Sequence, residues 1–421
     1  MSSTLPQSPA LPELDSIVPM VTPSDHGWSA SFQGLTLRTA LQPIFSISHK
    51  RVVGYEALIR AFDTDNASVL PLHLFQLPTS ESENILLDRL CRYLHVKNYA
   101  SFDDSLNWLF LNVSPKVVAN GRRYDSFFGQ LLQRTGLPPH RVVIEIVEQP
   151  TDDSAQLRDT VAYYQQLGCL TAIDDFGAGH SNFERIWNLS PDIVKLDRSL
   201  LTRATADKKA RQILNGIASL LHQSGCLVLL EGVETHDQAM IAIDAGVDFV
   251  QGFYFSHPSL DLKTMPAVTP NLESLLADYK HRNRSQLDPT QQITEFFSSL
   301  FEQAVHQLRE GSTLAIACHT LLTHHTVSRC YLINAIGVQI DDTLIAPTTS
   351  RSRDLRFMPL ENTASADWYR QHYLKQALAQ PERIHVTRPY LSVTGAYMCV
   401  TLSLAFPDNG ELKVLCCDIL A

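Results

Sequence analysis

Acidic, amide and basic side chains recur directly after short apolar segments in this 421-residue sequence. The set comprises Asn112, Glu145, Asp174, Asp175, Lys195, Glu231 and Gln251. Carboxylate and amide oxygens are the ligands that Mg²⁺ and Mn²⁺ prefer in proteins. Two such ions about 3.5–4 Å apart suit phosphodiester hydrolysis, because together they activate a water, neutralise the phosphate and stabilise the leaving oxygen. The residue types therefore indicate a two-metal hydrolytic site.

The adjacent pair Asp174-Asp175 offers the bridging ligand that a two-metal site needs. Asp174 can contact both ions while Asp175 points toward the second, and Lys195 can orient or deprotonate the attacking water if the cluster adjusts its pKa. A single carboxylate at the end of a strand is more often solvated or salt-bridged than metal-bound. The interpretation therefore rests on the whole set and not on any one member.

Two other nucleotide-binding motifs are excluded by their surroundings. Asp175-Phe-Gly177 matches the metal-binding triplet of protein kinases, but no glycine-rich phosphate loop or His-Arg-Asp segment accompanies it. Gly177-Ala-Gly179 lacks the third glycine of a dinucleotide-binding fingerprint. The sequence therefore indicates neither a kinase nor a dinucleotide-binding enzyme.

Strand-like and helical segments alternate from about residue 36 to 260, as in repeated β/α units around a parallel sheet. Strands are predicted at 41–44, 109–112, 142–146, 170–173, 193–196, 227–230 and 249–251, with helices that include 84–99, 155–167 and 208–224. The ends of these strands would bring the chemical residues to one rim of a (β/α)₈ barrel. An open doubly wound sheet also gathers strand ends at one edge, but the number of strands favours the barrel.

Composition sets limits on location and partners. The formal net charge of −10 argues against electrostatic capture of duplex nucleic acid, so no DNA partner is expected. The eight cysteines show no C-x-x-C pair or zinc-finger spacing, which suggests reduced thiols and a cytoplasmic protein. No apolar run approaches the roughly 18 residues of a membrane span, and the N-terminal segment lacks the pattern of a signal peptide.

Changes in pattern along the chain predict four segments. Residues 1–35 are rich in Pro, Ser and Asp and are expected to form a flexible tail. Residues 36–265 form the predicted barrel, and 266–310 form a helical connector. Strand-like runs return in 311–421, which we expect to be a smaller α+β domain.

Seven segments of the barrel region resemble, in order, the motifs of the EAL-domain cyclic di-GMP phosphodiesterases. They are Gly54-Tyr-Glu-Ala-Leu-Ile-Arg60, Asn112-Val-Ser-Pro115, Glu145-Ile-Val-Glu148, Asp174-Asp-Phe-Gly-Ala-Gly-His-Ser181, Asp192-Ile-Val-Lys-Leu-Asp197, Glu231-Gly-Val-Glu-Thr235 and Gln251-Gly-Phe-Tyr-Phe-Ser256. The resemblance implies a modified TIM barrel whose first strand, around 41–47, runs antiparallel to its neighbours. It also implies metal-dependent hydrolysis of cyclic di-GMP to linear pGpG with two Mg²⁺ or Mn²⁺ ions.

The resemblance assigns roles residue by residue. Glu56, Asn112, Glu145 and Asp174 would hold the first metal, and Asp174, Asp175 and Glu231 would hold the second. Lys195 would contact the catalytic water as a base or an orienting group, and Gln251 would help to position that water or the metal ligands. Gln42 and Arg60 would contact the dinucleotide, and Glu148 and Glu234 would support these groups. The alternative for Glu148 and Glu234 is that they are ordinary surface carboxylates. Ala61 stands where many members have Trp, and Val147 departs from the usual Glu-Leu-Thr-Glu, but neither change removes a ligand.

Other implications concern regulation and assembly. The loop Phe176–Asn188 resembles the segment through which family members form dimers, so a homodimer is expected. The C-terminal segment resembles PAS or Cache-type sensor domains, and Trp368, Arg370, Tyr373, Arg388 and Tyr390 are candidates to line a small-ligand pocket or to be core aromatics and solvated arginines. Two alternatives to the enzyme stay open: a catalytically silent cyclic di-GMP receptor that signals to a protein partner, and a hydrolase of another nucleotide.

Overall fold

The computed structural model describes two compact units, Met1–Lys280 and His281–Ala421. The described residues are 12–25, 27–101, 106–113, 125–147, 154–179, 183–261, 270–285, 289–347, 363, 366–392 and 397–420. Each unit has its own buried apolar core.

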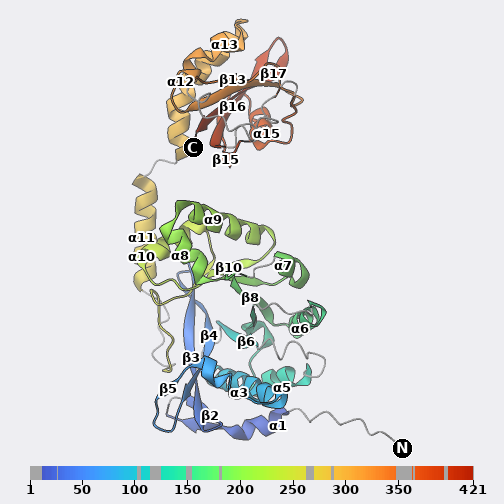
Figure 1. Ribbon diagram of the computed structural model, residues 1–421, viewed down its shortest axis with the longest axis vertical. Coiled ribbons are helices and arrows are strands. Elements are labelled where there is room, and N and C mark those ends of the chain that lie inside the picture. The colour runs from blue at the N-terminus through green and yellow to red at the C-terminus, as the bar shows by residue number, and fades with distance from the viewer. Residues whose placement is uncertain are drawn as a thin grey trace, which may run out of the picture. The chain divides into compact units, whose positions relative to one another are not determined.

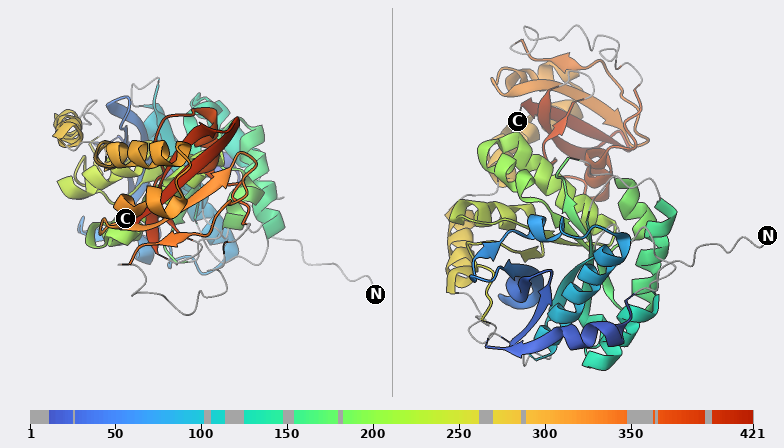
Figure 2. Two further views of the ribbon diagram at one scale, coloured as in Figure 1. Left: turned by 90° about the horizontal axis from the view of Figure 1, so that it is seen from above. Right: turned by 60° about the horizontal axis from the view of Figure 1, so that its bottom comes forward.

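The first unit is built on a closed barrel of eight strands (Figures 1 and 2). They are β3 (Leu35–Ser46), β4 (Arg51–Phe62), β6 (Trp108–Val113), β7 (Val142–Val147), β8 (Leu170–Phe176), β9 (Ile193–Leu196), β10 (Leu227–Leu230) and β11 (Phe249–Val250). β3 closes the barrel by pairing antiparallel with both β4 and β11, whereas the neighbours from β4 to β11 pair in parallel. The predicted barrel with one antiparallel strand is therefore confirmed, and the open doubly wound alternative is wrong.

Apolar side chains fill the inside of the barrel and the layer between its strands and the surrounding helices. Ile44, Phe110, Val143 and Leu229 belong to the cluster of alternate strand positions that fills the inside. The surrounding helices include α3 (Glu81–Ala100), α5 (Asp125–Thr135), α6 (Ser154–Gln166), α7 (Phe183–Leu189), α8 (Arg198–Ala206), α9 (Lys208–Gln223) and α10 (His236–Ala245). This packing fixes the strand ends that carry the polar residues, because a filled barrel cannot shift its strands singly.

The N-terminal segment differs from the prediction of a flexible tail through residue 35. α1 (Leu14–Ile17) buries both of its terminal apolar residues in the barrel core. β1 (Val21–Ser24) and β2 (Gly27–Phe32) form a hairpin, and β2 pairs antiparallel with β3. The polar composition of this segment did not predict these contacts, since the residues that it packs against lie in later parts of the chain. On the other edge, β5 (Ser68–Val69) pairs with β4 and is followed by α2 (Pro71–Leu74).

The predicted connector at 266–310 is divided between the two units. In α11 (Pro270–Ser285), Leu272 and Leu275 are buried in the barrel core. In α12 (Pro289–Arg309), Phe297 and Phe301 are buried in the core of the second unit. The described part of this segment is helical, as expected, but its two helices have apolar faces that pack on different units.

The second unit contains an antiparallel sheet in the order β13-β12-β17-β16-β14, with β15 also paired to β16. The strands are β12 (Val327–Asn334), β13 (Leu344–Ile345), β14 (His385–Val386), β15 (Tyr390–Leu391), β16 (Met398–Asp408) and β17 (Glu411–Leu420). α12, with the short helices α13 (Leu314–Ala317) and α14 (His319–Leu322), shares one apolar cluster with the sheet, and α15 (His372–Ala379) shares another. The unit has the predicted α+β composition, and its likeness to PAS or Cache domains stays a prediction. No helix in the described ranges is long and apolar enough to cross a membrane.

Candidate metal and phosphodiester site

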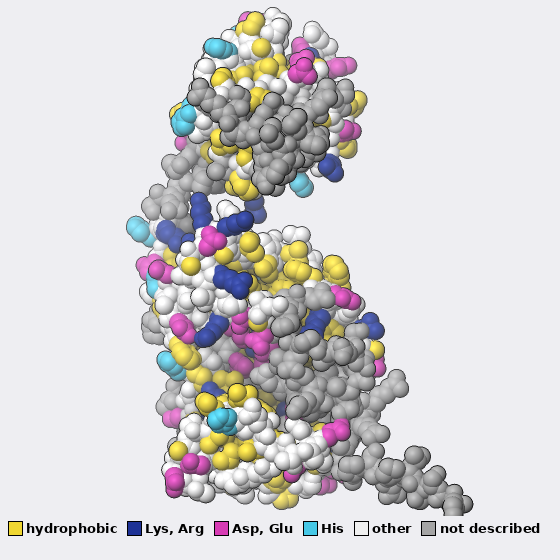
Figure 3. All heavy atoms as spheres, in the orientation of Figure 1, with side chains coloured by type: hydrophobic (Ala, Val, Ile, Leu, Met, Phe, Trp, Pro, Cys, Tyr) yellow, Lys and Arg dark blue, Asp and Glu magenta, His cyan; other side chains and the backbone are white. Residues whose placement is uncertain are grey.

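The barrel brings most of the predicted site residues to one end. Glu56 lies on β4, Asn112 on β6, Glu145 on β7, Asp174 and Asp175 on β8, and Lys195 on β9; Glu231 and Gln251 directly follow β10 and β11. Because the carboxyl ends of parallel strands meet at the same rim, residues almost 200 positions apart converge. Acidic side chains are visible together in the middle of the first unit in Figure 3.

Lys195 lies at the centre of the acidic cluster and is 1% exposed. Its Nζ is 2.5 Å from Glu145 Oε1, 2.7 Å from Glu231 Oε1 and 3.0 Å from Asp174 Oδ1. Glu56 Oε1 is farther away, at 3.8 Å. Burial alone would lower the pKa of Lys195, but the carboxylates, Asp174 foremost, raise the pKa well above its usual value. The side chain is therefore held as an ammonium ion.

Glu56 is held in place by two amide side chains. Gln251 Nε2 donates to Glu56 Oε2 over 2.6 Å, and Asn112 Nδ2 donates to Glu56 Oε1 over 3.2 Å. Gln251 Nε2 also lies 3.2 Å from Gln42 Oε1, and Gln42 donates to the backbone oxygen of Ser256 over 3.3 Å. This series of hydrogen bonds links the first barrel strand to the last, so closure of the barrel orients Glu56.

Asp174, Asp175 and Glu231 form the second part of the cluster. One carboxylate oxygen of each can be chosen so that the three lie within 4.8 Å of one another. Asp175 has a left-handed backbone with φ of 56°, next to an irregularity in the pairing of β8 with β9. A non-glycine residue in this region carries strain, which is common where a side chain is held for function. The turn allows two successive carboxylates to reach one site, although strand neighbours normally point to opposite faces.

The charge of the cluster fits divalent cations. Five carboxylates, those of Glu56, Glu145, Asp174, Asp175 and Glu231, surround a single ammonium group among the described residues, an excess of four negative charges when all are ionised. Two divalent ions would balance that excess, and hard oxygen ligands suit Mg²⁺, Mn²⁺ and Ca²⁺.

The ionisation of the carboxylates shows the same need for cations. Burial raises the pKa of Glu145 well above its usual range, and neither of its oxygens has a well-oriented hydrogen bond among the described residues, despite the near approach of Lys195. Burial also raises the pKa of Glu231 to about 8 and, together with the neighbouring Asp174, raises the pKa of Asp175. The described residues alone do not compensate this charge, whereas bound cations would.

Several predicted residues lie outside the central cluster. The half-buried Arg60 donates to the backbone oxygen of Ile59 over 2.9 Å, and burial lowers its pKa while Glu56 opposes that shift. Glu234 is exposed and lies 3.9 Å from Arg198, the geometry of a surface ion pair. Ala61 is buried in the barrel core, and Glu148 lies outside the described residues.

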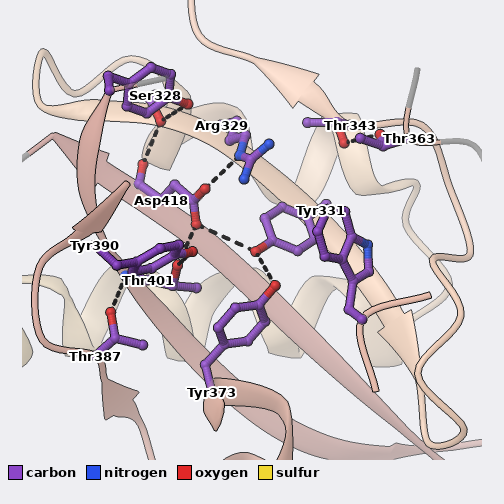
Figure 4. A network of polar contacts seen from close by, with 12 residues as sticks. Ser328, Arg329, Tyr331, Thr343, Thr363, Tyr373, Thr387, Tyr390, Thr401 and Asp418 are labelled. Atoms are coloured by element: carbon purple, nitrogen blue, oxygen red, sulfur yellow. Dashed lines mark hydrogen bonds and ion pairs between the residues drawn. The ribbon is translucent and has the colours of Figure 1, made fainter. Parts of the chain in front are cut away.

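The second unit contains a separate buried polar network (Figure 4) that the sequence did not predict. Asp418 on β17 accepts from Arg329 Nε over 2.5 Å and from Thr401 Oγ1 over 2.6 Å. Tyr331 contacts both Asp418, at 3.4 Å, and Tyr373, at 3.1 Å. The only signal in the sequence was a charged residue within the apolar run Leu415-Cys-Cys-Asp-Ile-Leu420.

Of the candidate pocket residues of this unit, the three aromatic ones belong to a single cluster, whereas the two arginines do not. Tyr390 joins the network through Thr401, at 2.5 Å, and Tyr373 joins it through Tyr331. Trp368 packs near Tyr331 with ring centroids 6.0 Å apart. The two predicted arginines, Arg370 and Arg388, are exposed.

An EAL domain model matches residues 28–258, more than half of the chain. The chain belongs to the EAL domain family. Within its barrel, the described parts of all seven family motifs lie on the strands or directly after them. In this member of the family the predicted metal ligands lie close together: Glu56, Asn112, Glu145, Asp174, Asp175 and Glu231.

Three relatives place this EAL domain among known proteins. The uncharacterised EAL-domain protein YkuI of Bacillus subtilis is 27% identical over 64% of this chain and 67% of its own, and its crystal structure with substrate c-di-GMP and calcium has a TM-score of 0.75 at 22% identity, covering 91% of this chain and 96% of that one. The cyclic di-GMP phosphodiesterase RocR of Pseudomonas aeruginosa is 27% identical over 60% of this chain and 63% of its own. A standalone EAL protein of Vibrio cholerae, in its c-di-GMP bound form, has a TM-score of 0.50 and 28% identity, covering 58% of this chain and 99% of that one.

These matches differ in how much of each protein they cover. The match to the YkuI structure shows a likeness of fold and covers 91% of this chain. Other curated relatives are much longer, since the chain spans only 22% to 36% of several of them. The EAL domain is the part that this chain shares with relatives named cyclic di-GMP phosphodiesterases.

Proposed function

We propose that this protein hydrolyses cyclic di-GMP to linear pGpG with two divalent cations, Mg²⁺ or Mn²⁺. The observation that carries the proposal is the convergence of five carboxylates and one amide around Lys195 at the rim of the barrel. Relatives named cyclic di-GMP phosphodiesterases support the choice of substrate. Loss of a metal-ligating residue would favour a silent receptor, but a carboxylate or amide residue stands at every predicted ligand position.

The roles of the side chains follow from their contacts. Glu56, Asn112, Glu145 and Asp174 would hold one cation, and Asp174, Asp175 and Glu231 the other. When bound, two such cations supply an activated water and neutralise charge on the phosphodiester. Gln251 keeps Glu56 oriented by donating to Oε2 over 2.6 Å.

Lys195 would act on the attacking water from the centre of the carboxylate cluster. Without bound cations, the carboxylates around its Nζ raise its pKa well above the usual value, so the group is an ammonium ion that donates hydrogen bonds. Bound cations would neutralise part of the negative charge that raises this pKa, so both roles, orienting the water and deprotonating it, belong to the proposal. As an ammonium ion, the group can also stabilise negative charge that develops on the phosphate in the transition state.

The test is turnover of cyclic di-GMP by the full-length protein in Mg²⁺ and in Mn²⁺, with pGpG resolved by chromatography. Glu56→Ala should abolish the product, whereas Glu81→Ala, at the exposed start of α3, should leave turnover within about two-fold, as expected for a surface substitution. Tight binding without any pGpG would favour the receptor. Equal turnover of unrelated cyclic nucleotides would refute selectivity for cyclic di-GMP.

Assembly as a homodimer is proposed through the segment that follows Asp175. Trp187 on α7 is 76% exposed, and Phe183 on the same helix packs against Phe176 with ring centroids 5.4 Å apart. Phe176 directly follows the predicted metal ligand Asp175, so burial of these rings by a second copy would act next to the metal site. Trp187→Glu should shift the mass measured by light scattering from dimer to monomer, and an unchanged mass would contradict this surface.

Regulation by the second unit, a small ligand of that unit and a cytoplasmic location are further parts of the proposal. The separate core of residues 281–421 supports a module that acts on the barrel without supplying its ligands. Comparing the full chain with one that ends at Ser285 tests regulation. Identical turnover, oligomeric state and response to added metabolites would contradict it.

A further inference from the structure

We propose that Arg38 and Arg60 together hold the second phosphodiester group of cyclic di-GMP, the one that is not cleaved. The inference rests on the proposed function and adds Arg38 as a substrate-positioning residue. It comes from the pairing of the first two barrel strands and from the absence of an ion pair to either guanidinium among the described residues.

The register of β3 and β4 puts both arginines on the face that carries the site. Gln42 lies opposite Glu56, and Arg38 lies opposite Arg60, with unbroken antiparallel pairing between these two positions. Directly opposite residues share a face, as do residues four apart on one strand. Arg38 therefore lies on the same face of the sheet as Glu56, opposite Arg60 near the C-terminal end of β4.

Like charges placed directly opposite each other destabilise a strand pair. No carboxylate among the described residues forms an ion pair with either guanidinium; Arg60 donates to a backbone oxygen, and Arg38 donates to Asn66 Oδ1 over 3.3 Å. The Nε of Arg38 is buried without an acceptor in the described part of the chain. Such an arrangement costs folding free energy, and an anion shared by the two groups would offset that cost.

The side chain of Arg38 is oriented before any ligand arrives. Its guanidinium lies 4.7 Å from the ring centroid of Phe62, and Asn66 holds one terminal nitrogen. Stacking and one hydrogen bond reduce the freedom that would be lost on binding. A planar guanidinium held in this way suits two parallel hydrogen bonds to phosphate oxygens.

The position along the strand selects which phosphate is held. Arg60 lies four residues beyond Glu56, roughly 13 Å along the strand at about 3.3 Å per residue. A phosphodiester bound at the carboxylate cluster is therefore remote from the backbone of the arginine pair. Cyclic di-GMP carries two phosphodiesters joined by its ribose ring system, so the arginines can take the second while the first lies at the cluster.

The test compares Arg38→Met and Arg38→Lys with Arg203→Met, which removes the same charge from an exposed position on α8. Four quantities are measured in the full chain: Kd for cyclic di-GMP in Ca²⁺ by calorimetry, kcat and KM for cyclic di-GMP in Mn²⁺, and turnover of bis(p-nitrophenyl) phosphate. The last substrate has a single phosphodiester and does not need the arginine pair.

Arg38→Met should raise Kd and KM for cyclic di-GMP about 10- to 100-fold, the usual effect of losing a hydrogen bond between charged groups, while kcat changes less than about three-fold. Arg38→Lys should lie between parent and Arg38→Met, because a point charge lacks the bidentate geometry. Turnover of bis(p-nitrophenyl) phosphate should be unchanged in both variants, and Arg203→Met should match the parent in all four quantities.

Two results would overturn the role of Arg38 alone: Kd and KM within two-fold of the parent, or an equal loss with both substrates, which would reveal a purely structural role. A parent protein that cleaves bis(p-nitrophenyl) phosphate but neither binds nor cleaves cyclic di-GMP would instead refute the proposed function, and the role of Arg38 with it. The two failures are therefore distinguishable.

Discussion

Replacement of Lys195 by Met should separate the structural role of this ammonium group from its role in turnover. Lys195 is the buried cation in contact with Glu145, Glu231 and Asp174, at 2.5, 2.7 and 3.0 Å. Breaking a buried ion pair by removing one partner costs about 3–5 kcal/mol, because the remaining charge is left without compensation. Part of this cost is relieved here when carboxylates take up protons, as the raised pKa of Glu231, about 8, allows.

The assay is urea unfolding followed by circular dichroism, first in EDTA and then in excess Mn²⁺. In EDTA, Lys195→Met should lower the free energy of unfolding by about 3 kcal/mol, and more at pH 8.5 than at pH 6.5, because the carboxylates stay ionised at the higher pH. In Mn²⁺ the variant should gain more stability than the parent, since the cations no longer compete with an ammonium group. Free Mn²⁺ at 100 times its Kd raises the free energy of unfolding by about 2.7 kcal/mol. Turnover should be lost in both conditions.

The matched control is Lys209→Met, an exposed lysine near the start of α9. Its effect on unfolding should stay within about 0.5 kcal/mol, as for most surface substitutions. A free energy of unfolding for Lys195→Met within 1 kcal/mol of the parent in EDTA would refute the idea that this cluster is unstable without cations.

Three further predictions concern other parts of the chain. Asp418→Asn should lower the unfolding free energy of the second unit by about 3 kcal/mol by leaving the buried Arg329 without its carboxylate, and a change below 1 kcal/mol by calorimetry would contradict the ion pair. Gly252→Ala should destabilise the barrel by about 1–3 kcal/mol and reduce turnover, because the new Cβ would lie 2.1 Å from the backbone oxygen of Val233; unaltered thermal unfolding would count against this. Burial lowers the pKa of His95 from its usual 6.5 to about 3, so this residue takes up a proton in the unfolded chain before it does in the folded one as pH falls. Between pH 7.5 and 5.5 the free energy of unfolding should therefore fall by about 1.4 kcal/mol more in the parent than in His95→Gln. Parallel plots of unfolding free energy against pH would contradict this.

Seven of the eight barrel strands could be predicted from the sequence, but β4 (Arg51–Phe62), which carries Glu56, was not among them. The segments 193–196 and 227–230 have the predicted bounds, and 142–146 is one residue short. Strands of a parallel barrel are buried on both faces, so they read as continuous apolar runs that stand out from the helices between them. The end of each run then located the carboxylates, which is why most of the acidic cluster could be predicted.

Contacts between distant segments could not be predicted from local patterns. The hairpin of β1 and β2 is stabilised by pairing with β3, whereas its own composition is that of a polar loop. Periodicity in α11 and α12 showed two helices but not which unit each one contacts. Likewise, the bond from Gln251 to Glu56 depends on closure of the barrel, across 195 positions of sequence.

The second unit shows the same limit more strongly. Its network joins Arg329 on β12 to Asp418 on β17, two strands that are neighbours in the sheet but far apart in the chain. The two arginines singled out in the sequence, Arg370 and Arg388, are exposed, in agreement with the alternative that they are solvated. The pairing of Arg329 with Asp418 could not be predicted, because the sheet pairs residues by register and not by proximity along the chain.

The central claim is that the carboxylate cluster binds two divalent cations that are required to cleave cyclic di-GMP. The most direct measurement titrates Mn²⁺ into metal-free, full-length protein in the presence of excess cyclic di-GMP and follows pGpG against the number of ions bound per chain. The account predicts little product at one bound ion, full activity at two, and none at any concentration in Glu56→Ala. Full activity at one ion, or tight binding of cyclic di-GMP with no pGpG at two, would contradict it.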